Sequence, residues 1–398
     1  MTERMQKWVT CYLFITLLVS SFVIFEPAPY DLLMIIFVVY GFIFSLIKMN
    51  KNSIFPLLIV FIFLISNLLS LFFVLEIRIS ILFVGITFYL ALTWTAIVGI
   101  IDYLKPVNLQ LIVKGYLISA CLSAVIGILA YLKLVPFGDL LLMYGRARGL
   151  FKDPNVFGPY LVMPALFAIS MTEVRGITVM KKNIYFGAFL ILTTGIVVSF
   201  SRAAWGNYAI SLFIFLFVLK REFIRKRIKT FMFLLLVGVP TFLYLLQTPV
   251  IEDFLISRLS YQNYDNDRFD TQKAAFLTGL ANPFGVGAGQ SDNVFQYSPH
   301  SLYARVFTEN GVIGLLSIIL LIILSILKSF KGYWYTRDEH SVLYLVISAS
   351  LVGLAFNSFF VDTLHWRNLW LLLALAWAPK LNRRNAVKQK GGRMEDSL

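Results

Sequence analysis

The sequence has 398 residues, of which 59% are hydrophobic and only 14% are charged, whereas soluble domains carry about 25% charged residues. This composition excludes an ordinary soluble protein and indicates a polytopic membrane protein, since each spanning helix needs roughly 20 apolar residues. The formal net charge of +14 would suit either nucleic-acid binding or a topology signal, and its distribution along the chain decides between them.

Apolar runs predict about twelve transmembrane helices, which puts both termini on the same side of the membrane. If that side is cytoplasmic, 24 of the 35 Lys and Arg residues fall in inner segments. This excess follows the positive-inside rule, so the charge sets topology and does not indicate nucleic-acid binding. The expected fold class is all-α, with residues 1–398 forming a single integral membrane domain. The expected spans are 8–25, 30–47, 55–74, 80–101, 111–132, 155–172, 184–199, 206–219, 231–250, 303–327, 341–360 and 367–379.

The first five expected spans have short connections and few internal polar residues, so we assign them to scaffold and lipid contact. The apolar run after MTERMQK is long enough to be a span, and no small-residue cleavage site follows it, so no removable signal peptide is expected. Cys11 and Cys121 both fall inside apolar runs and are expected to be core residues, which carry no information about the redox compartment.

Basic residues stand out in the outer segment before the sixth span, about 133–154. This segment ends in the sequence DPN, where Asp153 can cap a helix that begins at Pro154. Arg146 and Arg148 precede this helix start, and cations on the outer side run against the bias of membrane insertion. We therefore consider them candidates for binding an anionic ligand.

The next outer connection, SFSRAAW, is very short and places Arg202 at the membrane boundary, while Arg268 lies in a longer outer loop. An anion large enough to gather several of these arginines would be a phosphate or a diphosphate, which Arg binds through paired hydrogen bonds. The alternative is that each arginine extends to lipid headgroups or pairs with a nearby acid.

The longest outer segment, 251–302, is rich in polar residues, Gly and Pro, unlike the rest of the chain. We expect amphipathic helical pieces around 251–260 and 268–281. The sequence GVGAG that follows lacks the strand and helix of a dinucleotide site, so it predicts a tight turn that brings the backbone close to another element. In the sequence DND, Asp265 and Asp267 resemble a metal-binding pair of nucleotide-sugar transferases, but a solvated turn is favoured because nucleotide sugars are absent outside the membrane.

The end of this loop, SPHS, predicts Ser298 as a helix N-cap and Pro299 as the first helical residue. His300 then falls in the first turn of the next span, where the helix dipole disfavours an imidazolium and leaves a neutral base. Of the other two histidines, His365 is expected at the membrane interface and His340 on the inner side. No His or Cys cluster has transition-metal spacing and no phosphate-binding loop indicates ATP, so the sequence predicts no metal and no cofactor.

Four segments, taken in this order, resemble the O-antigen ligase and O-antigen polymerase superfamily of bacterial cell-surface polysaccharide assembly. They are RARGLFKDPNVFG, SFSRAAW, DRFDTQKAAFLTGLANPFGVGAG and PHSLYARVFTENGVIGLL. The likeness covers roughly 140–320, with weaker support from the spacing of Asp362, Arg367 and Trp370. Each motif alone is loose, but their order and their common outer side make the combination more specific.

In that superfamily the essential histidine opens the span after the large outer loop, and His300 occupies this position. The essential arginines lie in the short Ser-Arg connection and before the glycine-rich turn, which corresponds to Arg202 and Arg268. The resemblance implies that these three are the catalytic residues. The substrate-binding residues expected around them are Arg146, Arg148, Asp153, Asn155, Ser201, Gly287, Ser301 and Arg305. Two departures from the pattern are Ser301, where Asn is common, and Ala275-Phe276, where a Trp is common.

The resemblance implies a metal-independent, inverting glycosyltransferase of the membrane-embedded GT-C type. Its donor would be a glycan linked to polyprenyl (undecaprenyl) diphosphate, and its acceptor would be a hydroxyl of a lipid, protein or glycan. The expected location is the bacterial cytoplasmic (inner) membrane, with both termini cytoplasmic and the active site on the outer face. Ligase and polymerase both stay open, because they differ in the acceptor.

A transporter or flippase for polysaccharide or lipid-linked glycan is the alternative of another class, and a non-catalytic membrane scaffold is a third. A transporter would bury charge near the bilayer midplane or break helices in both halves of the chain. Most charged residues here lie at span ends and the polar segments gather on one side, so an enzyme is favoured. A scaffold function would not explain why the arginines and His300 are placed on the outer side.

Overall fold

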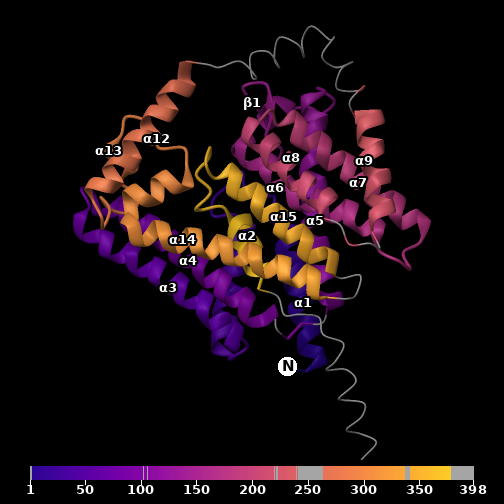
Figure 1. Ribbon diagram of the computed structural model, residues 1–398, viewed down its shortest axis with the longest axis horizontal. Helices are drawn as coiled ribbons and strands as arrows, with labels where there is room; N and C mark the ends of the chain where they lie inside the picture. The colour runs from indigo at the N-terminus through magenta and orange to yellow at the C-terminus, as the bar shows by residue number, and fades with distance from the viewer. Residues whose placement is uncertain are drawn as a thin grey trace, which may run out of the picture.

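The chain folds into helices joined by short turns, as the apolar runs predicted (Figure 1). The computed structural model describes residues 2–101, 103–104, 106–218, 220, 223–238, 240, 263–336 and 341–377. The helices of the first half are α1 (Glu3–Leu18), α2 (Pro29–Ile43), α3 (Lys51–Ser70), α4 (Ile77–Ile101), α5 (Pro106–Tyr131), α6 (Pro154–Glu173) and α7 (Val179–Val198). Those of the second half are α8 (Arg202–Phe217), α9 (Ile224–Phe233), α12 (Asn263–Ala281), α13 (Ser291–Val294), α14 (Leu302–Tyr335), α15 (Ser341–Asn357) and α16 (Arg367–Leu375).

Shorter elements complete the described chain. They are the 3-10 turns η1 (Leu71–Phe73) and η2 (Gly138–Leu141), the π turn η3 (Leu234–Gly238), and the strands β1 (Leu142–Met143) and β2 (Arg146–Ala147). The two strands pair antiparallel as a small hairpin before α6. Sequence analysis did not predict this hairpin.

Six helices of the described chain are long and apolar enough to cross a membrane, which supports a mostly helical, polytopic membrane protein. The other predicted spans also coincide with helices, but these are shorter, and the span predicted at 231–250 falls largely outside the described residues. Twelve crossings therefore stay a prediction. The six helices are Lys51–Phe73, Ile77–Ile101, Val107–Tyr131, Pro154–Glu173, Val179–Val198 and Leu302–Tyr335.

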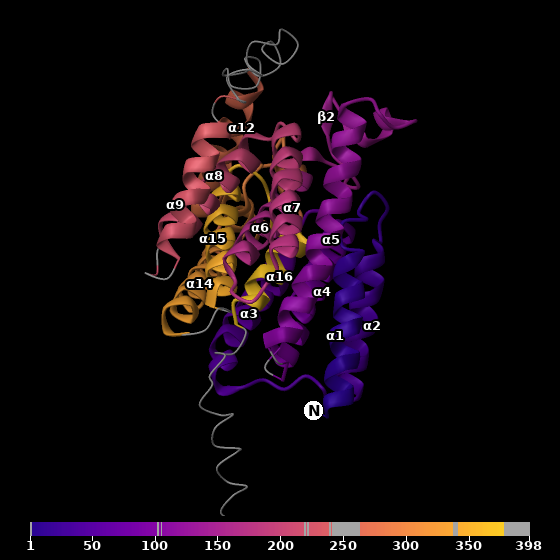
Figure 2. The ribbon, with the colours of Figure 1, turned by 90° about the vertical axis from the view of Figure 1, so that its right-hand side faces the viewer.

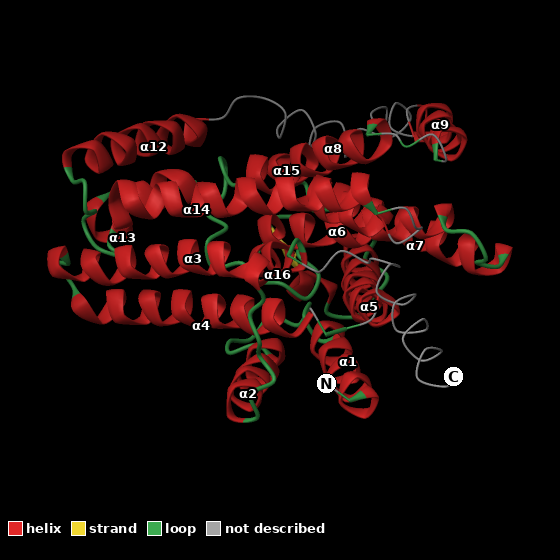
Figure 3. Cartoon of the chain, turned by 60° about the horizontal axis from the view of Figure 1, so that its bottom comes forward, coloured by secondary structure: helices red, strands yellow, loops and turns green. Residues whose placement is uncertain are grey.

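Helix α14 links two groups of helices. On one side α12, α14, α3 and α4 lie in successive layers (Figure 3). On the other side α15 packs on α14, and α8 and α6 pack on α15. Seen from the side, α12 and β2 lie at one end of the molecule and the N-terminus lies at the opposite end (Figure 2). Helix α12 and the hairpin, which both belong to segments predicted to be outer, thus lie at the end away from the N-terminus.

A break in α14 seats the glycine-rich turn on this helix. Gly311 has a φ of 68°, which lies in the left-handed region, and a Cβ at this position would lie 2.0 Å from the carbonyl oxygen of Pro283. The same carbonyl accepts a hydrogen bond of 3.1 Å from the backbone N–H of Val312. Only glycine permits this conformation together with this close approach. The turn after α12 is therefore fixed against the first part of α14.

Candidate active site

The hairpin before α6 positions Arg146. Its turn residues, Tyr144 and Gly145, have φ values of 51° and 71°, the two positive values that a tight two-residue hairpin turn requires. Arg146 follows in β2 and is buried, with 9% of its surface exposed. Its Nε donates to the carbonyl oxygen of Ser199 at 3.0 Å, and its Nη2 donates to Oδ1 of Asn155 at 2.8 Å. The guanidinium is thereby tied to both α6 and the α7–α8 turn.

The start of α6 follows the sequence prediction. Asp153 is the N-cap, with its Oδ1 accepting from the backbone N–H of Asn155 at 2.7 Å, and Pro154 is the first helical residue. The cap satisfies one of the free N–H groups of the first turn. As a result Asp153 and Asn155 are held beside Arg146.

The turn between α7 and α8 carries backbone strain. Phe200 has a φ of 45°, a left-handed conformation that is costly for a residue other than glycine and tends to mark functional sites. Its ring packs near those of Tyr131 and Trp205, with centroids 5.6 and 6.1 Å away. Ser201 then caps α8, since its Oγ accepts from the backbone N–H of Ala204 at 3.3 Å. Arg202, the first residue of α8, takes its position from this strained turn.

Helix α12 brings Arg268 and Gln272, one helical turn apart, to the same region. Gln272 donates through Nε2 to the carbonyl oxygens of His300 and Phe359, at 3.1 and 3.3 Å. Arg268 donates through Nη2 to the carbonyl oxygen of Phe360. The helix predicted around 268–281 is confirmed, and it is tied both to the segment of His300 and to the connection between α15 and α16.

The predicted cap of α14 was wrong. The N-cap is Ser301, whose Oγ accepts from the N–H of Ala304 at 3.4 Å and donates to the carbonyl oxygen of Ser358 at 3.3 Å. Helix α14 therefore begins at Leu302, and His300 lies just before the cap and not in the first turn. The choice of Ser301 over Ser298 follows from a carbonyl 57 residues away, which no local pattern reveals.

His300 remains accessible, but its surroundings favour the neutral imidazole. Burial among the site residues lowers the pKa of His300, and the positive charge of Arg268 lowers it further, against smaller opposing effects of three carboxylates. A neutral base was expected from the helix dipole, whereas desolvation and Arg268 are the causes in the structure. The three carboxylates are Asp362, Asp153 and Asp292.

These segments enclose one cavity of about 820 Å³, within the range of roughly 300–1,000 Å³ typical of ligand pockets. Three guanidiniums and two carboxylates, those of Asp153 and Asp267, line it, so its charged residues sum to one positive charge when His300 is neutral. Apolar rings, including that of Phe200, form other parts of the wall. The predicted site residues that line the cavity are His300, Arg202, Arg268, Arg146, Asp153 and Asn155.

The remaining predicted site residues do not line this cavity. Ser201 and Ser301 are buried helix caps. Arg148 lies in the same loop as Arg146 but donates from Nη1 to the carbonyl oxygen of Lys152 at 3.2 Å and from Nη2 to that of Leu140 at 2.7 Å. Both bonds hold the Arg148 guanidinium within its own loop.

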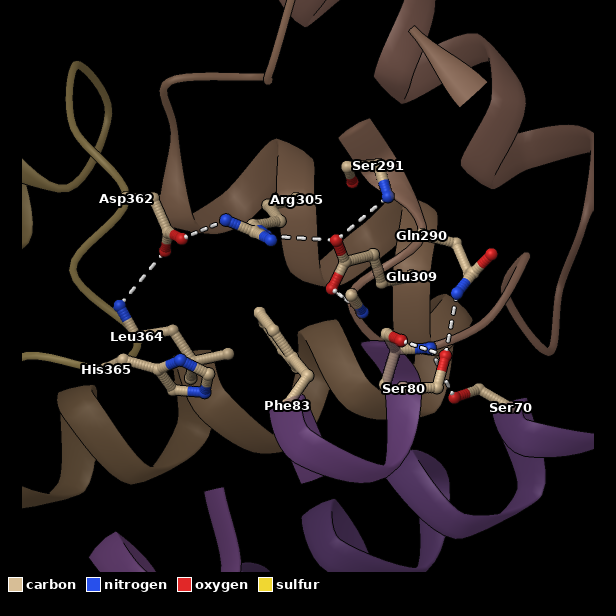
Figure 4. Close-up of polar contacts among 12 residues, drawn as sticks. Ser70, Ser80, Phe83, Gln290, Ser291, Arg305, Glu309, Asp362, Leu364 and His365 are labelled. Carbon is tan, nitrogen blue, oxygen red and sulfur yellow. Dashed lines mark hydrogen bonds and ion pairs between the residues drawn. The ribbon is translucent and has the colours of Figure 1, made fainter. Parts of the chain in front are cut away.

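Arg305, predicted to bind substrate, is instead part of a buried ionic network (Figure 4). Its Nε donates to Glu309, one turn along α14, at 2.9 Å, and its Nη1 donates to Asp362 at 2.8 Å. Glu309 is fully buried and also accepts from the backbone N–H groups of Gly289 and Ser291, at 2.7 and 3.2 Å. The network joins α14, the glycine-rich turn and the α15–α16 connection. Sequence analysis missed Glu309, although an acid one turn after an arginine in an apolar helix is a signal for such a pair.

The sequence GVGAG forms the tight turn that was predicted. Gly287 has a φ of 114°, and a Cβ on it would lie 2.5 Å from the side chain of Val74, so it packs on the connection between η1 and α4 and does not line the cavity. Ser80 of α4 donates to the carbonyl oxygen of Ala288 at 2.6 Å and accepts from Gln290 at 2.8 Å (Figure 4). The turn thus brings the backbone close to scaffold helices.

Replacing Glu309 by Ala should lower the free energy of unfolding by about 3–5 kcal/mol, because it leaves Arg305 short of one of its two anions and two backbone donors without an acceptor. Thermal unfolding of the purified protein in detergent measures this loss. The matched control is Glu26→Ala, which removes a 2.9 Å ion pair to the half-exposed Lys152 and a 4.0 Å contact to Arg367, and it should cost about 0–1 kcal/mol because Glu26 is itself about half exposed. Equal losses in the two variants would contradict a stabilising role of the network.

In the connection between α15 and α16, the ring of His365 is packed inside the protein, and its predicted place at the membrane interface stays a prediction. This ring packs on Phe83, with centroids 4.2 Å apart, and lies 3.0 Å from Oγ1 of Thr87. Burial lowers the pKa of His365 to about 4, so the ring is neutral. Arg367 donates to both carboxylate oxygens of Asp31. The segment containing Asp362 and Arg367 therefore ties the last helices to the rest of the fold.

Among the described side chains, no group of three or more His, Cys, Asp or Glu residues is placed to hold a metal ion. The side chain of Asp265, in the sequence DND, lies outside the described part of the chain. Asp267 is exposed on α12 and contributes to the cavity wall. The ionisable groups described at the cavity, apart from tyrosine hydroxyls, are those of arginine, aspartate and histidine.

Comparison with known proteins finds one family match. Residues 187–319 match the O-antigen ligase family (Wzy_C), which covers about a third of the chain. The matched segment contains Arg202, Arg268 and His300, whereas Arg146 and the start of α6 lie before it. A search of curated proteins finds no match to the chain.

Proposed function

Because the chain carries an O-antigen ligase domain at residues 187–319, we propose that it is a glycosyltransferase that acts on a lipid-linked glycan. The donor is a glycan on polyprenyl (undecaprenyl) diphosphate, and the acceptor is a hydroxyl at the outer face of the bacterial cytoplasmic membrane. The observation that carries this proposal is the single cavity into which four separate segments bring His300, Arg146, Arg202 and Arg268.

The proposed reaction needs a base and a site for an anionic leaving group. A sugar hydroxyl is a weak nucleophile until its proton is removed, and a neutral histidine in the cavity can accept that proton. The acceptor oxygen forms a bond to the anomeric carbon while the bond from that carbon to the diphosphate oxygen breaks. The electron pair leaves with the lipid diphosphate, and a single in-line displacement inverts the anomeric configuration.

The arginines suit the charge that develops on the diphosphate. Guanidinium groups bind phosphate oxygens through paired hydrogen bonds, and fixed charges in a partly enclosed site stabilise a leaving group without reorganisation. Arg202 and Arg268 lie in the matched family segment, and Arg146 joins them in the cavity wall. Arg148 has both terminal nitrogens on backbone carbonyls, so Arg146 is the better candidate of the two neighbours.

The position of the cavity in the molecule, together with the distribution of Lys and Arg along the sequence, supports an outer active site. The cavity is built from segments at the end of the molecule that carries α12 and the hairpin, opposite to the N-terminus (Figure 2). The positive-inside rule assigns the N-terminal end to the cytoplasm because most Lys and Arg residues lie in segments predicted at that end. We propose that both termini are cytoplasmic and that the cavity opens on the outer side.

Reconstitution of the purified protein in lipid vesicles with a glycan-diphosphate lipid tests this function. The expected result is release of lipid diphosphate together with transfer of the glycan to the acceptor, at equal rates with and without EDTA. Translocation of the lipid-linked glycan without release would support the transporter alternative. Loss of transfer with EDTA would contradict the metal-independent mechanism. It would make Asp265 and Asp267 the candidate metal ligands.

The acceptor decides between ligase and polymerase. A ligase transfers the glycan to a lipid or protein anchor, whereas a polymerase transfers it to the end of another glycan chain. The same vesicles, supplied with one acceptor class at a time, separate these two reactions by the size and the anchor of the product. We favour the ligase reaction, in line with the description of the matched family.

The pH dependence of transfer should respond to Arg268. The charge of Arg268 lowers the pKa of His300, so Arg268→Gln should raise that pKa and move the acidic limb of kcat to higher pH. Asp292, which is exposed and raises the same pKa, provides the matched control. Asp292→Asn should move the limb to lower pH, as measured by initial rates across the acidic range. Limbs at the same pH in both variants would show that His300 is not the titrating base.

A further inference from the structure

The exposed surface of α12 changes character along the helix. Every charged residue of α12 lies at or before Lys273, and no charged side chain follows in the sequence until Asp292. Beyond Lys273 the exposed side chains of the helix itself are apolar. We define the α12 apolar strip as Phe276, Leu277 and Leu280, together with Phe284 just after the helix, which are 40, 58, 69 and 54% exposed.

The other face of the same half of α12 packs on α14, which lies in the next layer (Figure 3). Ala275 is fully buried, and its carbonyl oxygen accepts from Oγ1 of Thr308 at 2.6 Å. A Cβ on Gly279 would lie 2.7 Å from the ring of Phe307, so this close approach requires a residue without a side chain. Small residues therefore seat α12 on α14, and the apolar strip is left on the outside of the pair.

The strip continues the exposed apolar surface of two candidate membrane spans. The ring of Phe284 is stacked on that of Phe73, with centroids 6.2 Å apart, and Phe73 ends the candidate span Lys51–Phe73. On the other side of the turn, the carbonyl oxygen of Pro283 accepts from Val312 of α14, which is 41% exposed. Lipid tails are as apolar as leucine, so apolar side chains on the outside of a span face lipid. The strip therefore adjoins a lipid-facing surface.

The two halves of α12 indicate its level in the membrane. Charged side chains are costly in hydrocarbon, so the first half excludes α12 as a span. A helix that combines charged residues with an apolar face suits the plane of the membrane interface. Beside the strip, the exposed Lys273 is long enough to extend its ammonium group to the headgroups, and Asn282 donates to the carbonyl oxygen of Thr278 at 2.9 Å.

We propose that α12 lies at the outer boundary of the bilayer, with its apolar strip in contact with the acyl chains of outer-leaflet lipids. A contiguous exposed apolar surface marks a protein or membrane contact, and its continuity with two spans favours lipid. The same helix brings Arg268 and Gln272 to the wall of the candidate active-site cavity. The contact therefore holds this wall close to the lipid headgroups, and the inference does not depend on the proposed function.

Quenching of a fluorescent label tests this contact. Full-length protein with Cys11→Ala and Cys121→Ala, which removes the two native cysteines, receives Leu280→Cys labelled with bimane. The protein is placed in nanodiscs of phosphatidylethanolamine and phosphatidylglycerol. We expect strong quenching by lipids whose nitroxide lies near the headgroup and weak quenching by iodide in the water. Leu277→Cys, at a second exposed position of the strip, should give the same pattern.

Two further positions are the matched controls. Leu316→Cys replaces a 60% exposed residue of the candidate span Leu302–Tyr335 and should be quenched by lipids whose nitroxide lies deeper among the acyl chains. Asp292→Cys, at an exposed position of α13, should be quenched by iodide and not by either lipid. Because all replaced side chains are exposed, each variant should keep the thermal unfolding midpoint of the cysteine-free protein. If Leu280→Cys lowers it, Leu277→Cys decides the result.

Two outcomes would overturn the proposal. Quenching of the strip label by iodide as strong as that of the Asp292→Cys label, without quenching by lipid, would place the strip in water. Protection from both iodide and lipid would show that protein, such as a second copy of the chain, covers it. None of these measurements involves glycan transfer, so failure of the proposed function leaves the test unaffected.

Discussion

Replacement of His300 by Ala is expected to lower the rate of lipid diphosphate release by about 10²–10⁴-fold, the usual contribution of a positioned general base. The residue lines the cavity, and both desolvation and Arg268 keep its imidazole neutral. The variant removes the group that accepts the acceptor hydroxyl proton while leaving the three arginines in place. Initial rates in reconstituted vesicles with saturating donor measure the effect.

Two controls separate catalysis by His300 from a structural role. The backbone carbonyl of His300, which accepts from Gln272, is unchanged in His300→Ala, so the thermal unfolding midpoint should stay close to that of wild type. His300→Gln keeps a polar side chain that cannot take up a proton and should be as inactive as the Ala variant. His340→Ala, at a position predicted on the inner side, should retain full activity. Transfer at the wild-type rate by His300→Ala would remove this residue from the mechanism.

Replacement of Arg202 by Gln is expected to reduce kcat by about 10²–10³-fold, comparable to the loss of one donor from a preorganised anion site. Arg202 is the first residue of α8 and lines the cavity where the leaving diphosphate is proposed to lie. The largest effect should fall on kcat, since negative charge on the departing oxygen increases in the transition state. Rates of lipid diphosphate release across donor concentrations give kcat and KM separately.

Arg148 provides the matched control for Arg202. It is an outer arginine of the same predicted anion-binding set, but its terminal nitrogens donate to the carbonyl oxygens of Leu140 and Lys152. Arg148→Gln should therefore change kcat by less than about threefold, since any effect comes only from the loop. Arg202→Lys keeps the charge but loses the planar fork and should fall between wild type and Arg202→Gln. Equal losses for Arg148→Gln and Arg202→Gln would contradict the assignment of the diphosphate to the cavity.

The sequence by itself was sufficient to predict the features that depend only on residues close together in the chain. Apolar runs predicted the helices, Asp153 and Pro154 predicted the start of α6, and the spacing of glycines predicted the tight turn near Gly287. Caps, turns and hydrophobic periodicity act over a few residues, so a single chain reveals them. The outer arginines and His300 likewise led to the prediction of a phosphate-bearing substrate, which stays a prediction.

Only the tertiary structure decided which of these side chains share a cavity. Arg146 reaches it and Arg148 does not, because a hairpin and contacts to the α7–α8 turn orient the first, whereas backbone carbonyls of its own loop hold the second. Ser301 caps α14 in place of Ser298 because the carbonyl of Ser358 lies within reach. Such choices depend on contacts between segments tens of residues apart, whose energies are set by packing and desolvation and not by local sequence pattern.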